Sequence, residues 1–302
     1  MSDFVKQECS TLNFNTPNSW VILSPIEQGI KAKIEKLGTP LKDWHINIYR
    51  GALTGFNDAF IISGKKRQEI LNNCRTNAER QRTDELIRPI LRGRDIKRYE
   101  YNFADLYLIN THNGVKDKNI PRIDIKDYPA IKKHLDEYWD KISTRADKGD
   151  TPYNLRNCAY MEDFFKPKIV WGEISDKSKF AFDFEGRFMP EATTFYMNGE
   201  NIEFLLAALN SLLSEWFFSK IGTTTGVGTV RWKKYTIEQL LVAKPEKELL
   251  EKYLIVFDNF KNNKITVSDF EEYSNNLMFS LYKLTDKEIS FIKGITLDIK
   301  KV

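Results

Sequence analysis

The chain has 302 residues, of which 41% are hydrophobic and 13% aromatic, enough to bury one large core or two small ones. Its net charge is only +4, so binding to a polyanion would require basic residues to gather on one face. Cys9, Cys74 and Cys158 form no CxxC pair and the three histidines add no ligand spacing, which argues against a zinc site or a disulfide framework and favours a reducing cytoplasm. No segment approaches the roughly 20 apolar residues of a membrane span, and the first ten residues lack a signal-peptide core. We therefore expect a cytoplasmic protein with no membrane partner.

The first predicted element is a helix over Ser24–Leu37, because its isoleucines and final leucine fall on one helical stripe. Ser24 is a suitable N-cap, and Gly38 ends the helix. The stretch "IYRGALTGFNDAFII", residues 48–62, then predicts a glycine-containing turn between apolar runs. Its last part, Ala59–Ile62, is predicted to be a short buried strand.

Three later stretches are rich in β-branched and aromatic residues and alternate or run apolar, which predicts strands. They are Asp105–Asn110, Pro167–Ile174 and Lys179–Met189. A helix is predicted between the first two stretches, over Tyr128–Ile142, from its apolar spacing. This part of the chain is expected to form a substantial mixed sheet with inserted helices.

The chain becomes helical after Asn198. Residues 201–221, "NIEFLLAALNSLLSEWFFSKI", are apolar nearly all round and predict a buried helix. A flexible Gly/Thr loop follows, and then two helices over Glu246–Phe260 and Ser268–Tyr282. Thr285 and Glu288 form a capping-box pattern ahead of a final helical turn.

Together these patterns predict an α+β fold with two parts. Residues 1–198 are expected to form a mixed β-sheet domain with inserted helices. Residues 199–302 are expected to supply the buried helix, a basic loop and a C-terminal helical portion that packs on the first part.

Common catalytic and cofactor motifs were sought without success: the sequence contains no GxxxxGK[ST], HExxH or GxSxG. Asp95, Asp124 and Asp298 each begin an Asp-Ile-Lys triplet, as found in metal-dependent nucleases, but three copies in a lysine-rich chain favour chance. Asp150–Asn157, "DTPYNLRN", partly matches the Pro-Tyr loop of amino-methyltransferases. It lacks the second proline and the preceding Asn-Pro or Asp-Pro, so an ordinary turn is favoured. No catalytic, cofactor-binding or metal-binding residue is predicted.

Two clusters of basic residues are the strongest functional signal. The first lies in "LRGRDIKRY", where a glycine and a tyrosine accompany Arg92, Arg94, Lys97 and Arg98. The second follows the Gly/Thr loop and consists of Arg231, Trp232, Lys233 and Lys234. Such groups can contact phosphate oxygens, and two of them together indicate a polyanion. A weaker third group is Lys166, Lys168 and Trp171, of which Trp171 is predicted to be core; for any single residue, solvated surface is the alternative.

An ordered set of segments resembles the TaqI-like C-terminal specificity domain of adenine-N6 DNA methyltransferases and type II (IIG-like) restriction-modification enzymes. The segments are "RGALTGFNDAFII", "LIRPILRGRDIKRY", "FFKPKIVWGEIS", "ATTFYM", "GTVRWKKYTIEQLLVAKP" and "LMFSLYKLTDKEI". The likeness runs from about Trp20 to the C-terminus. No single motif decides it, but the order is specific.

The resemblance implies that this chain selects a DNA sequence and that catalysis lies elsewhere. In the family, a separate N-terminal domain binds S-adenosylmethionine and carries the Asn/Asp-Pro-Pro-Tyr loop. The expected partners are therefore double-stranded DNA and a methyltransferase catalytic domain or subunit, with no cofactor in this chain. A role in phage defence is also implied. Whether the chain is a separate subunit or part of a shortened methyltransferase gene stays open.

The resemblance also gives a meaning to the turn after residue 48. Gly51, Thr54, Gly55 and Asn57 resemble the G-x-x-T-G-x-N hallmark near the start of the family's recognition domain. Thr54 and Asn57 are expected either to stabilise the turn or to reach DNA, and Arg50 is the residue placed nearest phosphate.

Two alternatives from other classes remain at this point. One is a nuclease that uses an Asp-Ile-Lys site with a divalent metal ion. The other is a protein-interaction module whose basic residues are merely solvated.

Overall fold

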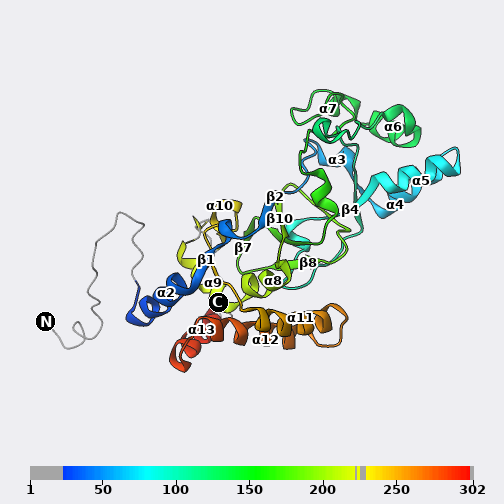
Figure 1. Ribbon diagram of the computed structural model, residues 1–302. Coiled ribbons are helices and arrows are strands. Elements are labelled where there is room, and N and C mark those ends of the chain that lie inside the picture. The colour runs from blue at the N-terminus through cyan, green and yellow to red at the C-terminus, as the bar shows by residue number, and fades with distance from the viewer. Residues whose placement is uncertain (1–22, 222, 225–228, 300–302) are drawn as a thin grey trace. The chain divides into compact units, whose positions relative to one another are not determined.

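The computed structural model describes residues 23–221, 223–224 and 229–299, and it has the predicted α+β architecture (Figure 1). The chain divides into two compact units. The first unit comprises Met1–Trp44, Ala207–Thr223 and Tyr235–Val302, and the second comprises His45–Leu206 and Thr224–Lys234. The division of the sequence at residues 198 and 199 stays a prediction.

One sheet of the second unit has the strand order β2-β10-β6-β8, and all neighbours are antiparallel. Its strands are β2 (Ile46–Arg50), β10 (Thr194–Gly199), β6 (Lys168–Gly172) and β8 (Phe180–Asp183). Tyr196 in β10 lies opposite Tyr49 on one side and Val170 on the other. Nearly every residue of β6, β8 and β10 is buried, which explains why these stretches are continuously apolar rather than alternating.

A second sheet has the order β3-β5-β4-β9, in which β4 and β9 are parallel and the other pairs antiparallel. Its strands are β3 (Ile61–Ser63), β5 (Leu106–Ile109), β4 (Ile87–Leu91) and β9 (Met189–Pro190). A small sheet joins β11 (Thr223–Thr224), β12 (Val230–Arg231) and β7 (Ile174–Ser175).

Helices are inserted between these strands. They are α3 (Asn57–Phe60), α4 (Gly64–Asn72), α5 (Asn77–Leu86), α6 (Pro129–Asp136) and α7 (Trp139–Ile142), with 3₁₀ turns η2 (Gly93–Asp95), η3 (Lys116–Lys118), η4 (Ile125–Asp127) and η5 (Met161–Phe165). The side chain of Ser63 caps α4 by accepting from Lys66 N, and that of Thr76 caps α5 by accepting from Glu79 N.

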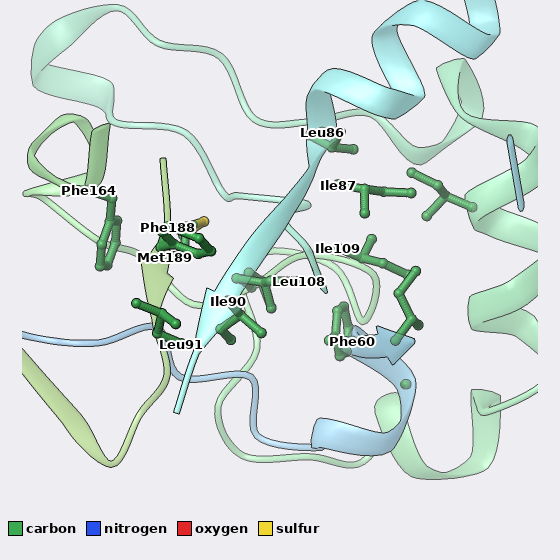
Figure 2. Close-up of a cluster of buried hydrophobic side chains, with 14 of the residues drawn as sticks. Phe60, Leu86, Ile87, Ile90, Leu91, Leu108, Ile109, Phe164, Phe188 and Met189 are labelled. Atoms are coloured by element: carbon green, nitrogen blue, oxygen red, sulfur yellow. The ribbon is translucent and has the colours of Figure 1, made fainter. Parts of the chain in front are cut away.

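The core of the second unit gathers apolar side chains from β4, β5, β9, α3 and α6. Figure 2 shows Ile90 and Leu91 of β4 beside Leu108 of β5, with Phe188 and Met189 nearby. This packing fixes the end of β4, from which the first basic cluster continues.

The first unit holds the strand pair β1 (Gly38–Pro40) and β13 (Leu241–Ala243) with several helices. These are α2 (Pro25–Leu37), α9 (Leu212–Ile221), α11 (Lys247–Lys261), α12 (Val267–Leu281) and α13 (Asp286–Ile299), with η1 (Leu41–Asp43); α10 (Lys234–Ile237) begins at the boundary of the units. Both predicted caps are present, because Glu27 accepts from Ser24 N at 2.8 Å and Glu288 accepts from Thr285 N at 2.7 Å. The predicted C-terminal helices are confirmed to within one residue.

The predicted single helix over residues 201–221 is wrong: it is two helices, α8 (Ile202–Asn210) and α9, bent by 72°. Ser211 explains the break, because its hydroxyl donates to Ala208 O at 2.8 Å and accepts from Ser214 N at 3.1 Å, so that it caps α9. Among the described residues no single helix is long and apolar enough to cross a membrane, although α8 and α9 taken together have that length and composition.

Three further predictions needed correction. Lys179–Met189 is not one strand, because β8 ends at Asp183 and Met189 begins β9, which lies in the other sheet. Ala59–Ile62 is not wholly a strand, since α3 occupies Asn57–Phe60 and β3 begins at Ile61. The helix predicted over Tyr128–Ile142 is interrupted, because Tyr138 leaves the helical conformation and packs its ring against Phe56 and His134. The Gly/Thr loop predicted after residue 221 lies mostly outside the described residues.

Lys168 and Lys166 illustrate two different environments for a cation. Lys168 has a wholly buried side chain, and its Nζ donates to Asp183 Oδ2 at 2.6 Å and to Phe164 O at 2.7 Å. Burial lowers the pKa of Lys168, although Asp183 opposes the shift. Lys166 is 60% exposed and pairs with Asp163 at 2.6 Å. Lys168 and the buried Trp171 therefore belong to the core.

We expect Lys168→Met to lower the free energy of unfolding by about 3–5 kcal/mol, because Asp183 would keep its charge without its buried partner. The matched control Lys166→Met removes an exposed ion pair and should cost at most about 1 kcal/mol. Urea-induced unfolding measures both values. Equal effects of the two substitutions would show that the buried pair does not hold β6 to β8.

Candidate nucleic-acid interface

The first predicted basic cluster lines a groove in the second unit, and two residues of the second cluster contact Glu173, which also lines that groove. The groove has a volume of about 560 Å³, and its charged lining residues are Arg94, Lys97, Glu173, Asp176 and Lys179. Gly93, Gly172, Ile174 and Thr193 also line it. We call it the basic groove. Its lining residues come from η2, from the last residue of β6, from strand β7 and from the residue before β10, and these segments are far apart in sequence.

A contact between two glycines brings these segments together. A Cβ placed on Gly93 would lie 3.2 Å from Gly172 Cα, so the backbones of η2 and β6 approach with no side chain between them. Glu173 N donates to Thr193 O at 2.9 Å on the same side. The sequence signal for this contact is a glycine in each of two otherwise bulky segments.

Arg92 forms an ion pair with Asp95 inside the first cluster. Its Nε and Nη2 donate to the two carboxylate oxygens of Asp95 at 2.9 and 2.7 Å, and Asp95 also accepts from Arg92 N at 3.0 Å. Burial alone would raise the pKa of Asp95, but the hydrogen bonds and charge of Arg92 outweigh burial and lower that pKa. With Arg92 held inward, the exposed side chains of the cluster are Arg94 and Lys97.

Arg98 and Tyr99 anchor the end of the first cluster. Arg98 is half-buried and donates to Ser178 O at 3.2 Å and to Ser178 Oγ at 2.8 Å. Tyr99 is 4% exposed, adopts a φ of 67°, and donates its backbone N–H to Phe180 O at 2.8 Å. Both residues tie the cluster to the segment that leads into β8.

The second cluster surrounds Glu173. Arg231 Nη1 lies 3.4 Å and Lys233 Nζ 3.7 Å from Glu173 Oε1, while Lys234 is exposed. Trp232 is 3% exposed and donates its backbone N–H to Glu173 O at 2.7 Å. Its own carbonyl accepts from Trp171 Nε1 at 2.8 Å, so the backbone of the second cluster is fixed to the core at Trp171.

The glycine turn after β2 is held by hydrogen bonds within itself. Thr54 is buried, donates its hydroxyl to Asn57 Oδ1 at 2.6 Å and accepts from Phe56 N at 3.2 Å. Exposed Asn57 lies 3.5 Å from Glu191 Oε1. Gly55 has a φ of 69°, which favours glycine. These contacts support the structural interpretation of the turn.

The same turn docks on the segment that leads to the basic groove. Gly51 N donates to Thr194 O at 2.9 Å, and a Cβ on Gly51 would overlap the carbonyl oxygens of Pro190 and Glu191. Arg50 is exposed and donates its Nε to Ala192 O at 2.7 Å.

A buried arginine that the sequence analysis missed also secures the turn. Arg145 donates to the carbonyl oxygens of Thr54, Asp147, Pro152 and Asn154, and it lies over the Phe60 ring at 4.3 Å. Burial lowers the pKa of Arg145 to about 10. Nothing in "STRADKG" distinguishes this arginine from a solvated one, because its acceptors are backbone carbonyls.

The predicted DNA-binding residues thus differ in exposure. The exposed ones are Arg50, Asn57, Arg94, Lys97 and Lys234; the half-buried ones are Arg92, Arg98, Arg231 and Lys233; the buried ones are Thr54 and Trp232. Their DNA-binding role stays a prediction. Lining residues that the sequence analysis did not single out are Glu173, Ile174 and Lys179.

A family model described as the TaqI-like C-terminal specificity domain matches residues 88–242, just over half of the chain. The chain belongs to this family. The resemblance inferred from the sequence is therefore confirmed. The matched residues of the specificity domain include both basic clusters and all lining segments of the basic groove, whereas the turn after β2 lies before them.

Two solved structures share the fold of this specificity domain. One is the type IIL restriction-modification enzyme MmeI, solved in complex with DNA, with a TM-score of 0.56 and 10% identity over 87% of this chain. The other is the type IIG restriction endonuclease BpuSI, with a TM-score of 0.51 and 12% identity over 86% of this chain. The chain spans 37% and 33% of their lengths. A comparison with curated proteins finds no match.

Two of the three Asp-Ile-Lys triplets begin with an aspartate that forms local hydrogen bonds. Asp95 is engaged by Arg92, and Asp124 caps a 3₁₀ turn by accepting from Lys126 N at 3.0 Å. The side chain of Asp298 lies outside the described residues. Within the described part of the chain, no group of three or more His, Cys, Asp or Glu residues is placed to hold a metal ion.

We expect Gly51→Ala to lower the free energy of unfolding by about 1–3 kcal/mol, because its methyl group would overlap two backbone carbonyls that cannot rotate away. Gly294→Ala is the matched control. A Cβ on Gly294 meets nothing within 4 Å in α13, so this change should be neutral or stabilise by up to about 1 kcal/mol. If urea unfolding finds Gly51→Ala as stable as the parent chain, the close docking of the turn is wrong.

We expect Asp95→Asn to cost about 1.5–3 kcal/mol at neutral pH, since it replaces a charge-assisted, two-point contact with Arg92. Because the pKa of Asp95 is lowered in the folded chain, its stabilisation is complete above the unfolded value of about 3.9 and is lost as the pH falls through the folded value. Urea unfolding across this range should show the parent and variant converging in acid. A difference independent of pH would contradict an ionised Asp95.

Proposed function

We propose that this chain is the DNA target-recognition module of a restriction-modification DNA methyltransferase that modifies adenine N6, and that it has no catalytic activity alone. The observation that carries the proposal is a groove lined by Arg94 and Lys97 of the first cluster and by Glu173, which the second cluster contacts, in a chain that belongs to a specificity-domain family. Neither cluster alone would distinguish a DNA-binding face from solvated surface.

The charges of the basic groove suit a nucleic-acid backbone. Arg94 and Lys97 are exposed and line the groove, so they are available to phosphate oxygens. Lys179 pairs with Asp176 at 2.6 Å and would exchange that exposed partner for phosphate at little cost. Arg231 and Lys233 widen the same face.

The partner in this proposal is a methyltransferase domain or subunit that binds S-adenosylmethionine. A methyltransferase that acts on adenine N6 must rotate its target base out of the duplex, so the recognition module would hold the duplex while the base enters the partner's active site. The likeness of fold to a type IIL restriction-modification enzyme that was solved in complex with DNA supports DNA as the ligand. A cytoplasmic location and a role in phage defence belong to the same proposal.

The two alternatives are tested with the same purified chain. Cleavage of duplex DNA that requires magnesium would favour the nuclease. The engagement of Asp95 by Arg92 and of Asp124 in a turn does not favour it. A stable complex with another protein and no DNA binding at low salt would favour a protein-interaction module.

We expect the chain to bind random duplex DNA with an affinity that falls steeply as salt rises, and Arg94→Ala with Lys97→Ala to weaken that binding. Because each lost phosphate contact lowers the logarithmic salt slope by about 0.9, the double variant should flatten the slope by about 2. Fluorescence anisotropy across a salt series measures both the affinity and the slope.

The control for this experiment is Lys247→Ala with Lys252→Ala, which removes two positive charges from α11, where they pair with Glu251 and Glu248. It changes the net charge equally and should leave the slope unchanged. Equal salt slopes for the two double variants would show that the basic groove is not part of the DNA interface. No binding by the parent chain at low salt would contradict the proposed function itself.

A further inference from the structure

Glu173 is an acidic residue held at the centre of basic side chains. Its Oε1 lies 3.4 Å from Arg231 Nη1 and 3.7 Å from Lys233 Nζ, and it shares the basic groove with Arg94 and Lys97. Its side chain is 18% exposed. The Glu173 side chain therefore lines the groove while most of its surface is shielded from solvent.

The backbone of Glu173 is fixed on both sides. Its N–H donates to Thr193 O at 2.9 Å, and its carbonyl accepts from Trp232 N at 2.7 Å. Trp232 is itself held by the hydrogen bond from Trp171 in the core. A side chain supported in this way has the positional accuracy that base recognition needs.

A carboxylate in this position repels phosphate and accepts hydrogen bonds only, so toward DNA it suits an amino group on a base edge. In the major groove, adenine presents its amino group beside the N7 acceptor, whereas cytosine presents N4 without a neighbouring acceptor. The adenine edge would place an acceptor lone pair next to the carboxylate. Cytosine is therefore the base that fits.

We propose that Glu173 is a specificity-determining residue that reads a cytosine by accepting a hydrogen bond from its N4 amino group. This inference rests on the proposed function and deepens it. Arg231 and Lys233 orient the carboxylate, and their positive charges offset the repulsion between Glu173 and the DNA backbone.

The neighbouring residue supplies an independent observation. Ile174 is 54% exposed and lines the same groove, where most of the other lining residues are charged or polar. An exposed isoleucine beside a carboxylate matches the C5 edge of a pyrimidine, which is apolar and adjoins N4 in cytosine. The groove thus offers one polar and one apolar contact to the same kind of base edge.

The test is selection of preferred sequences from a random duplex pool by the parent chain, Glu173→Gln and Asp176→Asn. The parent should select a site that contains a cytosine, and Glu173→Gln should lose about tenfold discrimination at that one position. Asp176→Asn is the matched control, since Asp176 lines the same groove but pairs with Lys179. It should retain the preference for cytosine.

Three outcomes would overturn the inference while leaving DNA recognition intact. They are a parent site with no cytosine, an unchanged preference in Glu173→Gln, and an equal loss of affinity for all sequences, which would make Glu173 only a positioning residue for Arg231 and Lys233. If Glu173→Gln folds poorly by thermal unfolding, Glu173→Asp gives the same readout, because it keeps the charge but withdraws it by one methylene. Failure of the parent chain to bind any duplex would instead overturn the proposed function.

Discussion

The backbone contact between Gly93 and Gly172 is the constraint on which the groove depends. A Cβ on either residue would lie 3.1–3.2 Å from the other's Cα, so a side chain at either position would push η2 and the end of β6 apart. Because β7 follows β6 and pairs with β12, Arg231 lies opposite Ile174 and near Glu173, and both of these residues line the groove with Arg94. Residues separated by more than a hundred positions thereby act on one surface.

Some cationic side chains of this chain are held by partners inside the fold, and others are exposed; the amino-acid composition does not distinguish the two groups. Arg92 is committed to Asp95, Arg145 to backbone carbonyls and Lys168 to Asp183, and in each case burial makes the partner indispensable. Arg94 and Lys97 belong to the same short segment as Arg92, but their side chains are exposed. The inner cations order the loops, and the outer ones remain for a ligand. The net charge of +4 therefore does not show which cations are available to a ligand.

The sequence predicted the elements whose patterns are local. Caps at Ser24 and Thr285 and the apolar runs of β5, β6 and β8 were found because each depends on neighbours within a few residues. The break at Ser211 was missed, since a serine within an apolar helix gives no warning that its hydroxyl will cap a second helix. Both basic clusters were found as well, but the position of the second cluster at Glu173, beside a groove that the first cluster lines, depends on strand pairing that no local pattern contains.

The central claim is that both clusters form one DNA-binding face, and lysine footprinting tests it most directly. The full chain would be acetylated with and without duplex DNA at low salt, and each lysine quantified by mass spectrometry. The account predicts that DNA protects Lys97, Lys179 and Lys233 together, while the exposed Lys65 and Lys126 of the same unit react as before. Protection of Lys65 and Lys126 with Lys97, Lys179 and Lys233 unchanged would contradict it.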